Sequence, residues 1–143
     1  MTNATAKKFG YPETCIKEFD TWIVLLRPQQ VTLGSLVLVC NEDATAFSDL
    51  TLTAFQELHP VIAQIENSLS RAFDYDKINY LMLMMVDPDV HFHVLPRYGH
   101  DRDFQGQTFR DHGWPGPPDL KQVTPTGDTL NQQLITHISD SWQ

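Results

Sequence analysis

The sequence predicts an α+β domain, in which an antiparallel sheet is crossed by one long helix and followed by an irregular C-terminal arm that ends in a short helix. Short apolar runs rich in β-branched residues indicate the strands, and apolar residues repeated at three- and four-residue steps indicate the helix. The length of 143 residues, of which 41% are hydrophobic and 20% charged, suits one domain with its own core. We therefore expect a single domain over residues 1–143.

The first two strands are predicted at TWIVLL (residues 21–26) and SLVLVC (residues 35–40). Both runs are apolar and β-branched, which is the usual composition of strands. The segment between them, RPQQVTLG, contains Pro28 and Gly34, and both residue types interrupt regular structure. We expect the two strands to pair as a hairpin-like unit.

The long helix is predicted from Leu52 to Phe73. Its apolar residues share one helical face, and they are Leu52, Phe55, Leu58, Ile62, Ile65, Leu69 and Phe73. Pro60 lies inside this stretch and lacks a backbone N–H, so the helix should either bend there or consist of two abutting helices.

Two further strands are predicted around a tight turn. KINYLMLMMV (residues 77–86) is apolar on both alternating faces, which indicates a central strand covered on both sides. Asp87-Pro88-Asp89 is typical of a turn, and residues 89–95 follow it at once as the next strand. We expect 77–86 and 89–95 to form an antiparallel pair.

The chain changes character after Pro96. Residues 99–128 are rich in Gly, Pro and Asp and show almost no apolar periodicity, which predicts a long irregular segment of the kind that often carries function. Asp128 is suited to cap a short helix, whose apolar face holds Leu130, Leu134 and Ile138.

Composition and charge narrow the function. A formal net charge of -8 argues against non-specific nucleic-acid binding, because that affinity comes from Lys and Arg neutralising phosphates. No apolar run is long enough to cross a bilayer, and none follows the N-terminal lysines, so no membrane association is expected. Cys15 and Cys40 lie far apart without a disulfide or metal-binding spacing, and a reducing cytoplasm is therefore the expected location.

The segment DPDVHFHVLPR (residues 87–97) holds the candidate site. Residues two apart on a strand point the same way, so Asp89, His91 and His93 should share one face, which faces a cleft or solvent. The opposite face holds an apolar set that should pack on the long helix: Val90, Phe92 and Val94. The pattern alone leaves three interpretations, namely a histidine nucleophile or proton shuttle, a metal site of two imidazoles and a carboxylate, and an inert polar face.

The metal interpretation lacks a diagnostic third ligand. Asp89 is one candidate, and the others come from elsewhere in the chain: His59, His100 and His112. None lies at a spacing typical of a zinc or iron site, so no metal ligand is assigned and a divalent ion remains an alternative.

Residues 89–97, Asp-Val-His-Phe-His-Val-Leu-Pro-Arg, resemble the signature of the histidine triad (HIT) nucleotide hydrolases and transferases, H-x-H-x-H followed by apolar residues and often Pro-Arg. The paired strands, the long helix and the strand that begins at Lys77 also follow in that family's order. The resemblance covers about residues 15–98, the expected core, and leaves about 99–143 as the arm. In the arm, the W-P-G-P run at 114–117 is similar to a segment of a bacterial branch that resembles diadenosine tetraphosphate hydrolases.

The resemblance implies a HIT-like fold and phosphate chemistry for which no cofactor is required. His91 takes the place of the nucleophile, which attacks the α-phosphate of a nucleoside phosphate or dinucleoside polyphosphate and forms a nucleotidyl-histidine intermediate. His93 would contact the phosphate. Asp89 stands where the first triad histidine is usual, and there it either orients the ring of His91 or favours its cationic form. A symmetric homodimer is also implied, and it would protect the edges of the sheet.

The same resemblance suggests further residues that bind the nucleotide. The family fold wraps ribose and base with the loop that holds Arg27 and Gln29 here, although exposed polar loop residues are the alternative interpretation of both. Arg97 and Asn79 are further substrate-binding candidates. Trp114, flanked by a proline in an irregular segment, is a candidate to close the pocket across a dimer.

The chain departs from the family in the loop before the histidines. Met84-Met85-Val86-Asp87-Pro88 stands where the family has Gly, Ala-Gly-Gln and a small hydroxyl residue, and the bacterial branch has Gly-Asn. The phosphate donors of that loop are therefore missing from the sequence. This departure supports a second hypothesis, a catalytically weak nucleotide-binding or interaction protein on the same scaffold.

Overall fold

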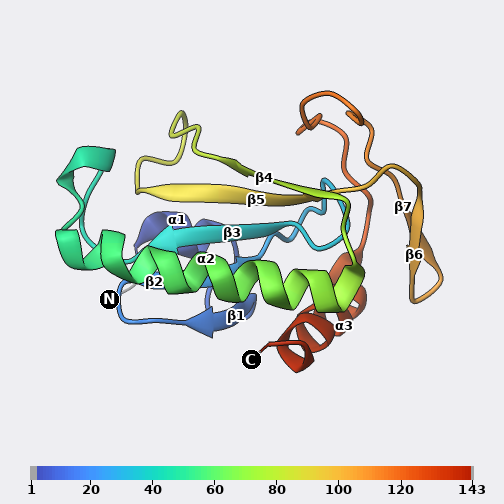
Figure 1. Cartoon of the computed structure of the whole chain (residues 1–143), viewed down its shortest axis with the longest axis horizontal. Helices are drawn as coiled ribbons and strands as arrows, with labels where there is room; N and C mark the ends of the chain where they lie inside the picture. The colour runs from blue at the N-terminus through green and yellow to red at the C-terminus, as the bar shows by residue number, and fades with distance from the viewer. Residues whose placement is uncertain (1–2, 143) are drawn as a thin grey trace.

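The computed structural model describes residues 3–142 and has an α+β architecture, as the sequence predicts (Figure 1). Within these residues a five-stranded sheet is crossed by a long helix, and a separate two-stranded hairpin extends from the arm. In chain order the elements are α1 (Ala4–Lys8), β1 (Cys15–Glu18), β2 (Trp22–Leu26), β3 (Leu36–Cys40), the 3-10 helix η1 (Phe47–Asp49), α2 (Leu52–Phe73), β4 (Lys77–Leu81), β5 (His91–Arg97), β6 (Arg102–Phe104), β7 (Gln107–Phe109) and α3 (Gly127–Asp140).

The main sheet has the strand order β1-β2-β3-β5-β4, and every neighbouring pair in it is antiparallel. The predicted hairpin-like pair is confirmed as β2 and β3, whose register begins with Trp22 opposite Cys40. β5 joins β3 with His93 opposite Val37 and His91 opposite Val39. The strand that carries both histidines is therefore an inner strand, held on both sides by backbone hydrogen bonds.

Helix α2 begins and ends at the predicted residues and continues through Pro60, so the alternative of two abutting helices is wrong. The hydroxyl of Thr51 caps it by accepting a hydrogen bond from the N–H of Ala54 (3.1 Å). Its buried side chains pack on one face of the sheet and are Ala54, Val61, Ile65, Ser68, Leu69 and Phe73. Leu52 and Phe55, which the periodicity placed on this face, are 74% and 37% exposed.

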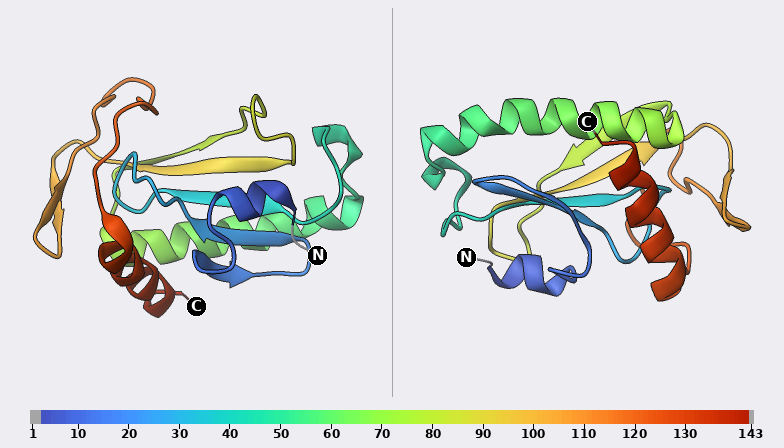
Figure 2. Two further views of the ribbon diagram at one scale, coloured as in Figure 1. Left: turned by 180° about the vertical axis from the view of Figure 1, so that it is seen from behind. Right: turned by 90° about the horizontal axis from the view of Figure 1, so that it is seen from below.

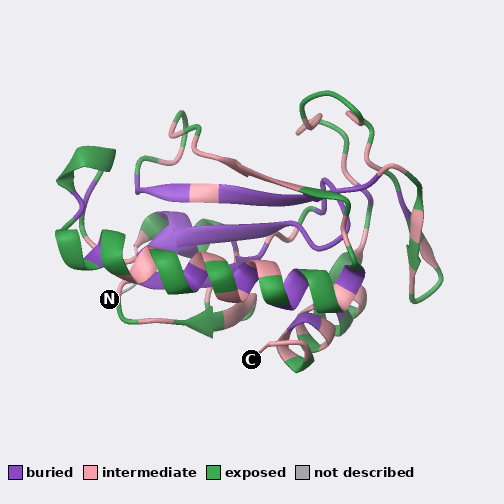
Figure 3. Ribbon diagram, in the orientation of Figure 1, coloured by how far each residue is buried: buried purple, intermediate pink, exposed green. Residues whose placement is uncertain are grey.

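The sheet is covered on both faces. α2 lies on one face, and the short N-terminal helix α1 lies on the other (Figure 2). Strands β2 and β3 are consequently buried along their whole length (Figure 3). The apolar cluster on the α1 side consists of Ala6, Phe9, Ile23, Leu25, Val37 and Val39. Neither α1 nor β1 was predicted, because elements of five and four residues are too short to show a period.

Strand β4 differs from its prediction. It pairs with β5 in the antiparallel sense as expected, but it ends at Leu81 and is an edge strand, so the prediction of a central strand over 77–86 is wrong. Residues 82–90 form an irregular connection in place of a tight turn, and β5 begins at His91 rather than at residue 89. An apolar run that continues from an edge strand into an exposed loop has the same sequence pattern as a strand buried on both faces. The pattern therefore predicted a strand that is too long and a central position in the sheet.

The C-terminal arm is more ordered than predicted. β6 and β7 form a hairpin, and Gln105 and Gly106 at its turn both have positive φ (51° and 80°), the geometry of a tight two-residue connection. Helix α3 buries Leu134 and Ile138 as predicted, but Asp128 lies in its first turn and does not cap it. Within residues 3–142 no helix is long and apolar enough to cross a bilayer.

Candidate functional site

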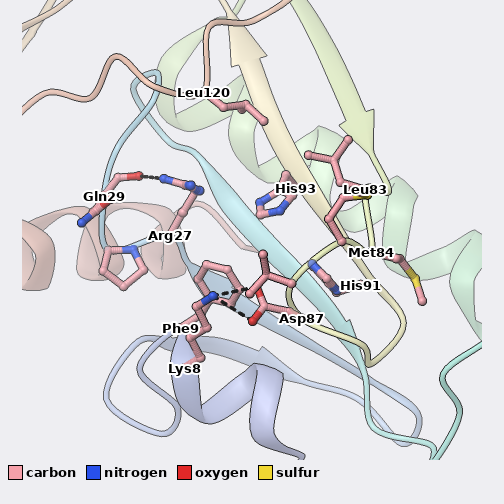
Figure 4. A pocket seen from close by; sticks show the side chains of 13 residues that line it. Lys8, Phe9, Arg27, Gln29, Leu83, Met84, Asp87, His91, His93 and Leu120 are labelled. Carbon is pink, nitrogen blue, oxygen red and sulfur yellow. Dashed lines mark hydrogen bonds and ion pairs between the residues drawn. The ribbon is translucent and has the colours of Figure 1, made fainter.

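His91 and His93 line a pocket of about 450 Å³ on the face of the sheet that carries α1 (Figure 4). Four parts of the chain form its walls. These are the end of α1, the loop that follows β2, the connection between β4 and β5, and Leu120 of the arm. The pocket therefore gathers residues that lie more than a hundred positions apart in the sequence.

His91 is held in one orientation by the backbone. Its Nδ1 lies 2.7 Å from the carbonyl oxygen of Asp89, and because a carbonyl can only accept, Nδ1 carries the proton. In the neutral ring, the lone pair is therefore on the other nitrogen, Nε2. The side chain is 1% exposed, so the ring is fixed by packing as well as by this hydrogen bond.

His93 has a different environment two residues along the same strand. Its Nδ1 is buried and has no hydrogen-bond partner among the described residues. Burial lowers the pKa of His93 to about 4, and the nearby charges of Arg27 and His91 act in the same direction. His93 is therefore a neutral imidazole at pH 7, able to form hydrogen bonds but not to supply positive charge.

Phe9 of the N-terminal segment packs on both histidines. Its ring centroid lies 6.2 Å from that of His91 and 5.8 Å from that of His93, where the contact is edge-to-face. The two imidazoles lie 5.3 Å apart at 79°. Helix α1 thus closes the side of the site that the sequence left open to a cleft or to solvent.

Asp89 precedes β5, and its carboxylate anchors α1. Its Oδ2 accepts hydrogen bonds from the hydroxyl of Thr5 (2.8 Å) and the backbone N–H of Thr5 (3.2 Å). The carboxylate therefore points to the side of the sheet that carries the histidines, as the alternation suggested, but it does not line the pocket. Among residues 3–142, no three His, Cys, Asp or Glu side chains are arranged to hold a metal ion.

Arg27 is the cation that faces the histidines. Its Nη1 donates to the carbonyl of Gln29 (2.5 Å), while its Nε is buried without a hydrogen-bond partner among the described residues. Burial lowers the pKa of the guanidinium from its ordinary value. In Figure 4 the side chain extends toward His93. A partly buried guanidinium with an unused donor is suited to bind an anion.

Solved structures with a similar fold share one description. A histidine triad protein from Bradyrhizobium japonicum has a TM-score of 0.76 and 21% identity, with 100% of this chain and 98% of that chain covered. A histidine triad protein from Sinorhizobium meliloti has a TM-score of 0.77 and 19% identity over 99% and 96% of the two chains. A histidine triad protein from Marinobacter aquaeolei has a TM-score of 0.71 and 22% identity over 90% and 87%.

The chain has the histidine triad fold. Neither a protein-family model nor a curated protein matches the sequence. At these identities the likeness establishes the HIT fold, and the roles of individual residues depend on the geometry of this chain.

The residues proposed from the sequence divide into two groups in the HIT fold of this chain. His91, His93, Arg27 and Gln29 meet at the pocket. Asn79, Arg97 and Trp114 do not line it. Trp114 instead lines a separate hollow in the arm and lies against Gly99.

Arg97 and Asn79 are occupied by contacts that hold the arm. The Nε and Nη2 of Arg97 donate to the carboxylate of Asp111 (2.6 and 2.9 Å), and its Nη1 donates to Oδ1 of Asn79 (2.7 Å). A further hydrogen bond runs from Nη2 to the carbonyl of Gly116 (2.9 Å). The side chains of Arg97 and Asp111 are 4% and 1% exposed. Arg97 and Asn79 therefore have a structural role, because their side chains hold the arm against β4 and β5.

Other pocket residues were not anticipated from the sequence. Lys8 and Phe9 come from α1 and the residue after it, and Lys8 donates to both carboxylate oxygens of Asp87 (2.8 and 3.0 Å). Leu120 comes from the arm. The cap at Asn3, whose side chain accepts from the N–H of Ala6, is the one local signal that marks the start of α1.

Proposed function

We propose that this chain binds nucleoside phosphates in the pocket and cleaves or transfers them at the α-phosphate, with His91 as the nucleophile. The substrates in this class include nucleoside phosphates and dinucleoside polyphosphates. The observation that carries the proposal is the hydrogen bond from Nδ1 of His91 to the carbonyl of Asp89, in the pocket of a HIT-fold chain. This bond fixes the tautomer in which Nε2 has a free lone pair.

The reaction has two half-reactions. In the first, Nε2 of His91 forms a bond to the α-phosphorus as the bond to the leaving group breaks, and the electron pair departs with the leaving group, which takes a proton from solvent. In the second, water attacks the phosphorus and loses a proton, and the phosphorus–nitrogen bond breaks to return the pair to Nε2. One water is consumed, and the nucleotide and the leaving group are released.

The pocket supplies charge and hydrogen bonds for these steps. Phosphoryl transfer is accelerated mostly by alignment and by stabilising charge on the phosphate oxygens. Arg27 offers positive charge and the unused Nε donor, and His93 offers a neutral ring nitrogen. The scheme uses no metal ion, and we expect activity without a cofactor.

The first test is mass spectrometry after brief incubation with adenylylated and guanylylated substrates, with and without a chelator. We expect a nucleotidyl adduct on His91 that the chelator does not remove. The His91→Asn variant should lose the adduct and lower kcat/KM by at least about a thousandfold while nucleotide binding is retained, because no covalent intermediate can form. His59→Asn, at an exposed position on α2, is the matched control and should behave as the unsubstituted chain.

A second candidate is a nucleotide-binding protein with little or no turnover. The connection between β4 and β5 favours it, because Leu83, Met85 and Val86 stand exposed there in place of phosphate-binding residues. Nucleotide binding without an adduct or turnover across the substrate panel would support this candidate. Turnover that His91→Asn leaves unchanged would exclude the nucleophile.

A further inference from the structure

We infer that Gln30 is a positioning residue for the proposed site, because its buried side chain fixes the loop that presents Arg27 to the phosphate. This inference rests on the proposed function, in which Arg27 binds the phosphate of the nucleotide. Gln30 does not line the pocket, so its effect on the phosphate passes through Arg27. The inference follows from the hydrogen bonds of Gln30, from their burial and from the contacts that join this loop to the arm.

The side chain of Gln30 is fully buried, and its amide binds both ends of the loop between β2 and β3. Its Nε2 donates to the carbonyl of Arg27 (2.7 Å) and to the carbonyl of Ser35 (2.9 Å). Its Oε1 accepts a hydrogen bond from the N–H of Gly34 (2.8 Å). Both amide hydrogens are therefore used, and one side chain closes the loop and holds the backbone of Arg27 directly.

Gly34, one of these partners, is itself fixed against helix α2. Its φ is 85°, and a Cβ atom at this position would lie 2.8 Å from Cε2 of Phe73. The glycine backbone thus packs directly on the ring of Phe73, where a side chain would not fit. The Oε1 of Gln30 consequently binds a part of the loop that the core holds in place.

The side chain of Arg27 takes its direction from the same loop. Its Nη1 donates to the carbonyl of Gln29 (2.5 Å), the residue before Gln30, and its backbone N–H donates to the carbonyl of Ser35 (2.9 Å). Its Nε remains buried without a partner among the described residues, and this is the donor offered to the phosphate. Because a hydrogen bond weakens steeply as its geometry departs from linear, a shift of the loop would move this donor off the phosphate.

The C-terminal arm binds the loop from its other side. The backbone carbonyl of Gln30 accepts a hydrogen bond from the N–H of Thr124 (2.9 Å), and the two residues form an isolated antiparallel bridge. On α3, Nδ2 of Asn131 donates to the carbonyl of Pro28 (3.3 Å), the neighbour of Arg27 in the sequence. The arm therefore contributes to the position of Arg27 through this loop.

Binding of nucleotides with and without a phosphate tests the inference. Adenosine is compared with adenosine monophosphate (AMP), and guanosine with guanosine monophosphate, by nuclear magnetic resonance titration. The ratio of the two dissociation constants measures what the phosphate contributes to binding. Gln30→Met keeps the length of the side chain but removes its hydrogen bonds. We expect this variant to bind AMP about tenfold more weakly and to weaken adenosine by less than about threefold, and Arg27→Met should show the same pattern.

The double variant Gln30→Met/Arg27→Met decides whether Gln30 acts through Arg27. It should bind AMP within about twofold of Arg27→Met alone, because the contact that Gln30 positions is already absent. With acetyl adenylate, an adenylylated substrate with a small leaving group, kcat/KM should show the same lack of additivity. Gln132→Met is the matched control, since Gln132 is exposed on α3 and does not line the pocket, and it should bind every ligand as the unsubstituted chain does.

A milder variant keeps the inference testable where Gln30→Met does not fold. Asn131→Leu removes only the side-chain contact to Pro28, and we expect it to weaken AMP by about threefold while adenosine binds as before. Unchanged binding of AMP in this variant and an additive double variant would each contradict the positioning of Arg27 by the loop.

The outcomes separate this inference from the proposed function. Equal weakening of adenosine and AMP in Gln30→Met, or full additivity with Arg27→Met, overturns the positioning role and leaves the proposed function standing. The expected pattern of binding without an adduct on His91 overturns the nucleophile and leaves the positioning of Arg27 standing. An unsubstituted chain that binds neither monophosphate and forms no adduct overturns both.

Discussion

At the residue scale, the two histidines of β5 are chemically different although they share a strand face. His91 donates from Nδ1 to a backbone carbonyl, whereas Nδ1 of His93 is buried without a partner in the described chain. Packing by Phe9 and the charge of Arg27 both disfavour a proton on His93. His91 is thus suited to covalent chemistry, and His93 is suited to contact the phosphate as a neutral ring.

The lowered pKa of His93 predicts a loss of stability in mild acid. The unfolded chain binds a proton near the ordinary pKa of 6.5, whereas the folded chain binds it only near a pKa of about 4. The stabilising contribution is therefore complete above pH 6.5 and is lost as the pH falls from there to about 4. We expect this residue to remove on the order of 2 kcal/mol from the free energy of unfolding between pH 7 and pH 4.5.

Urea unfolding at both pH values measures this loss. His93→Gln should show a smaller decrease in the free energy of unfolding than the unsubstituted chain, because glutamine does not titrate. The exposed His100→Gln provides the control and should keep the original dependence on pH. An identical decrease in His93→Gln and in the unsubstituted chain would mean that His93 is not the titrating group.

At the scale of elements, the site depends on how α1 is held against the sheet. A helix of five residues has little stability of its own, so its position comes from tertiary contacts. Thr5 is bound by Asp89, Lys8 by Asp87, and the side chain of Asn3 donates to the carbonyl of Cys40 (2.8 Å). These contacts bring Phe9 onto the histidines, and Asp89 thereby anchors one wall of the pocket.

The link between Thr5 and Asp89 predicts a shared effect on stability and turnover. Asp89→Ala leaves the buried N–H and hydroxyl of Thr5 without an acceptor, which should lower the free energy of unfolding by about 1–3 kcal/mol. Turnover of acetyl adenylate should fall by about tenfold or more, because Phe9 is no longer held against the two histidines. Urea unfolding and steady-state kinetics measure the two effects.

Substitutions at Thr5 separate the hydrogen bond from the volume of the side chain. Thr5→Ser keeps the hydroxyl and should stay close to the unsubstituted chain in turnover, whereas Thr5→Val removes it at nearly constant volume and should resemble Asp89→Ala. The double variant Thr5→Val/Asp89→Ala should lose less than the sum of the single variants, because both remove the same contact. Full additivity would show that the two residues act independently.

At the scale of the whole molecule, both faces of the sheet are covered, whereas each edge strand has a strand neighbour on one side only. The described chain leaves β1 and β4 each paired on one side only. Free strand edges offer unpaired backbone groups to another chain, and a symmetric dimer, the commonest oligomer, can protect them. The expectation of a homodimer from the sequence is consistent with this topology and stays a prediction.

Sedimentation equilibrium tests the oligomeric state directly. We expect a mass of twice 16.4 kDa at micromolar concentration. The same value for Leu52→Ser would show that the exposed start of α2 is not the contact. A mass of 16.4 kDa across the accessible concentrations would contradict the homodimer and would leave the pocket to be formed by one chain alone.

Local patterns in the sequence determined the elements that are long or regular. Three features result from residues only a few positions apart, so they can be predicted without knowledge of the fold. They are the period of α2, the paired strands β2 and β3, and the alternation that places His91 and His93 side by side. The same reading failed at β4, where a run of apolar residues leaves the sheet, and at α1, which is too short to show a period.

Tertiary structure alone decided what surrounds the histidines. Asp89 meets Thr5 across 84 positions, and Arg97 turns to Asp111 rather than to the pocket. The wall of the pocket joins Lys8, Arg27 and Leu120, which no periodicity relates. Such contacts depend on which buried polar groups form hydrogen bonds when distant segments pack together, and this pairing is determined by the fold as a whole.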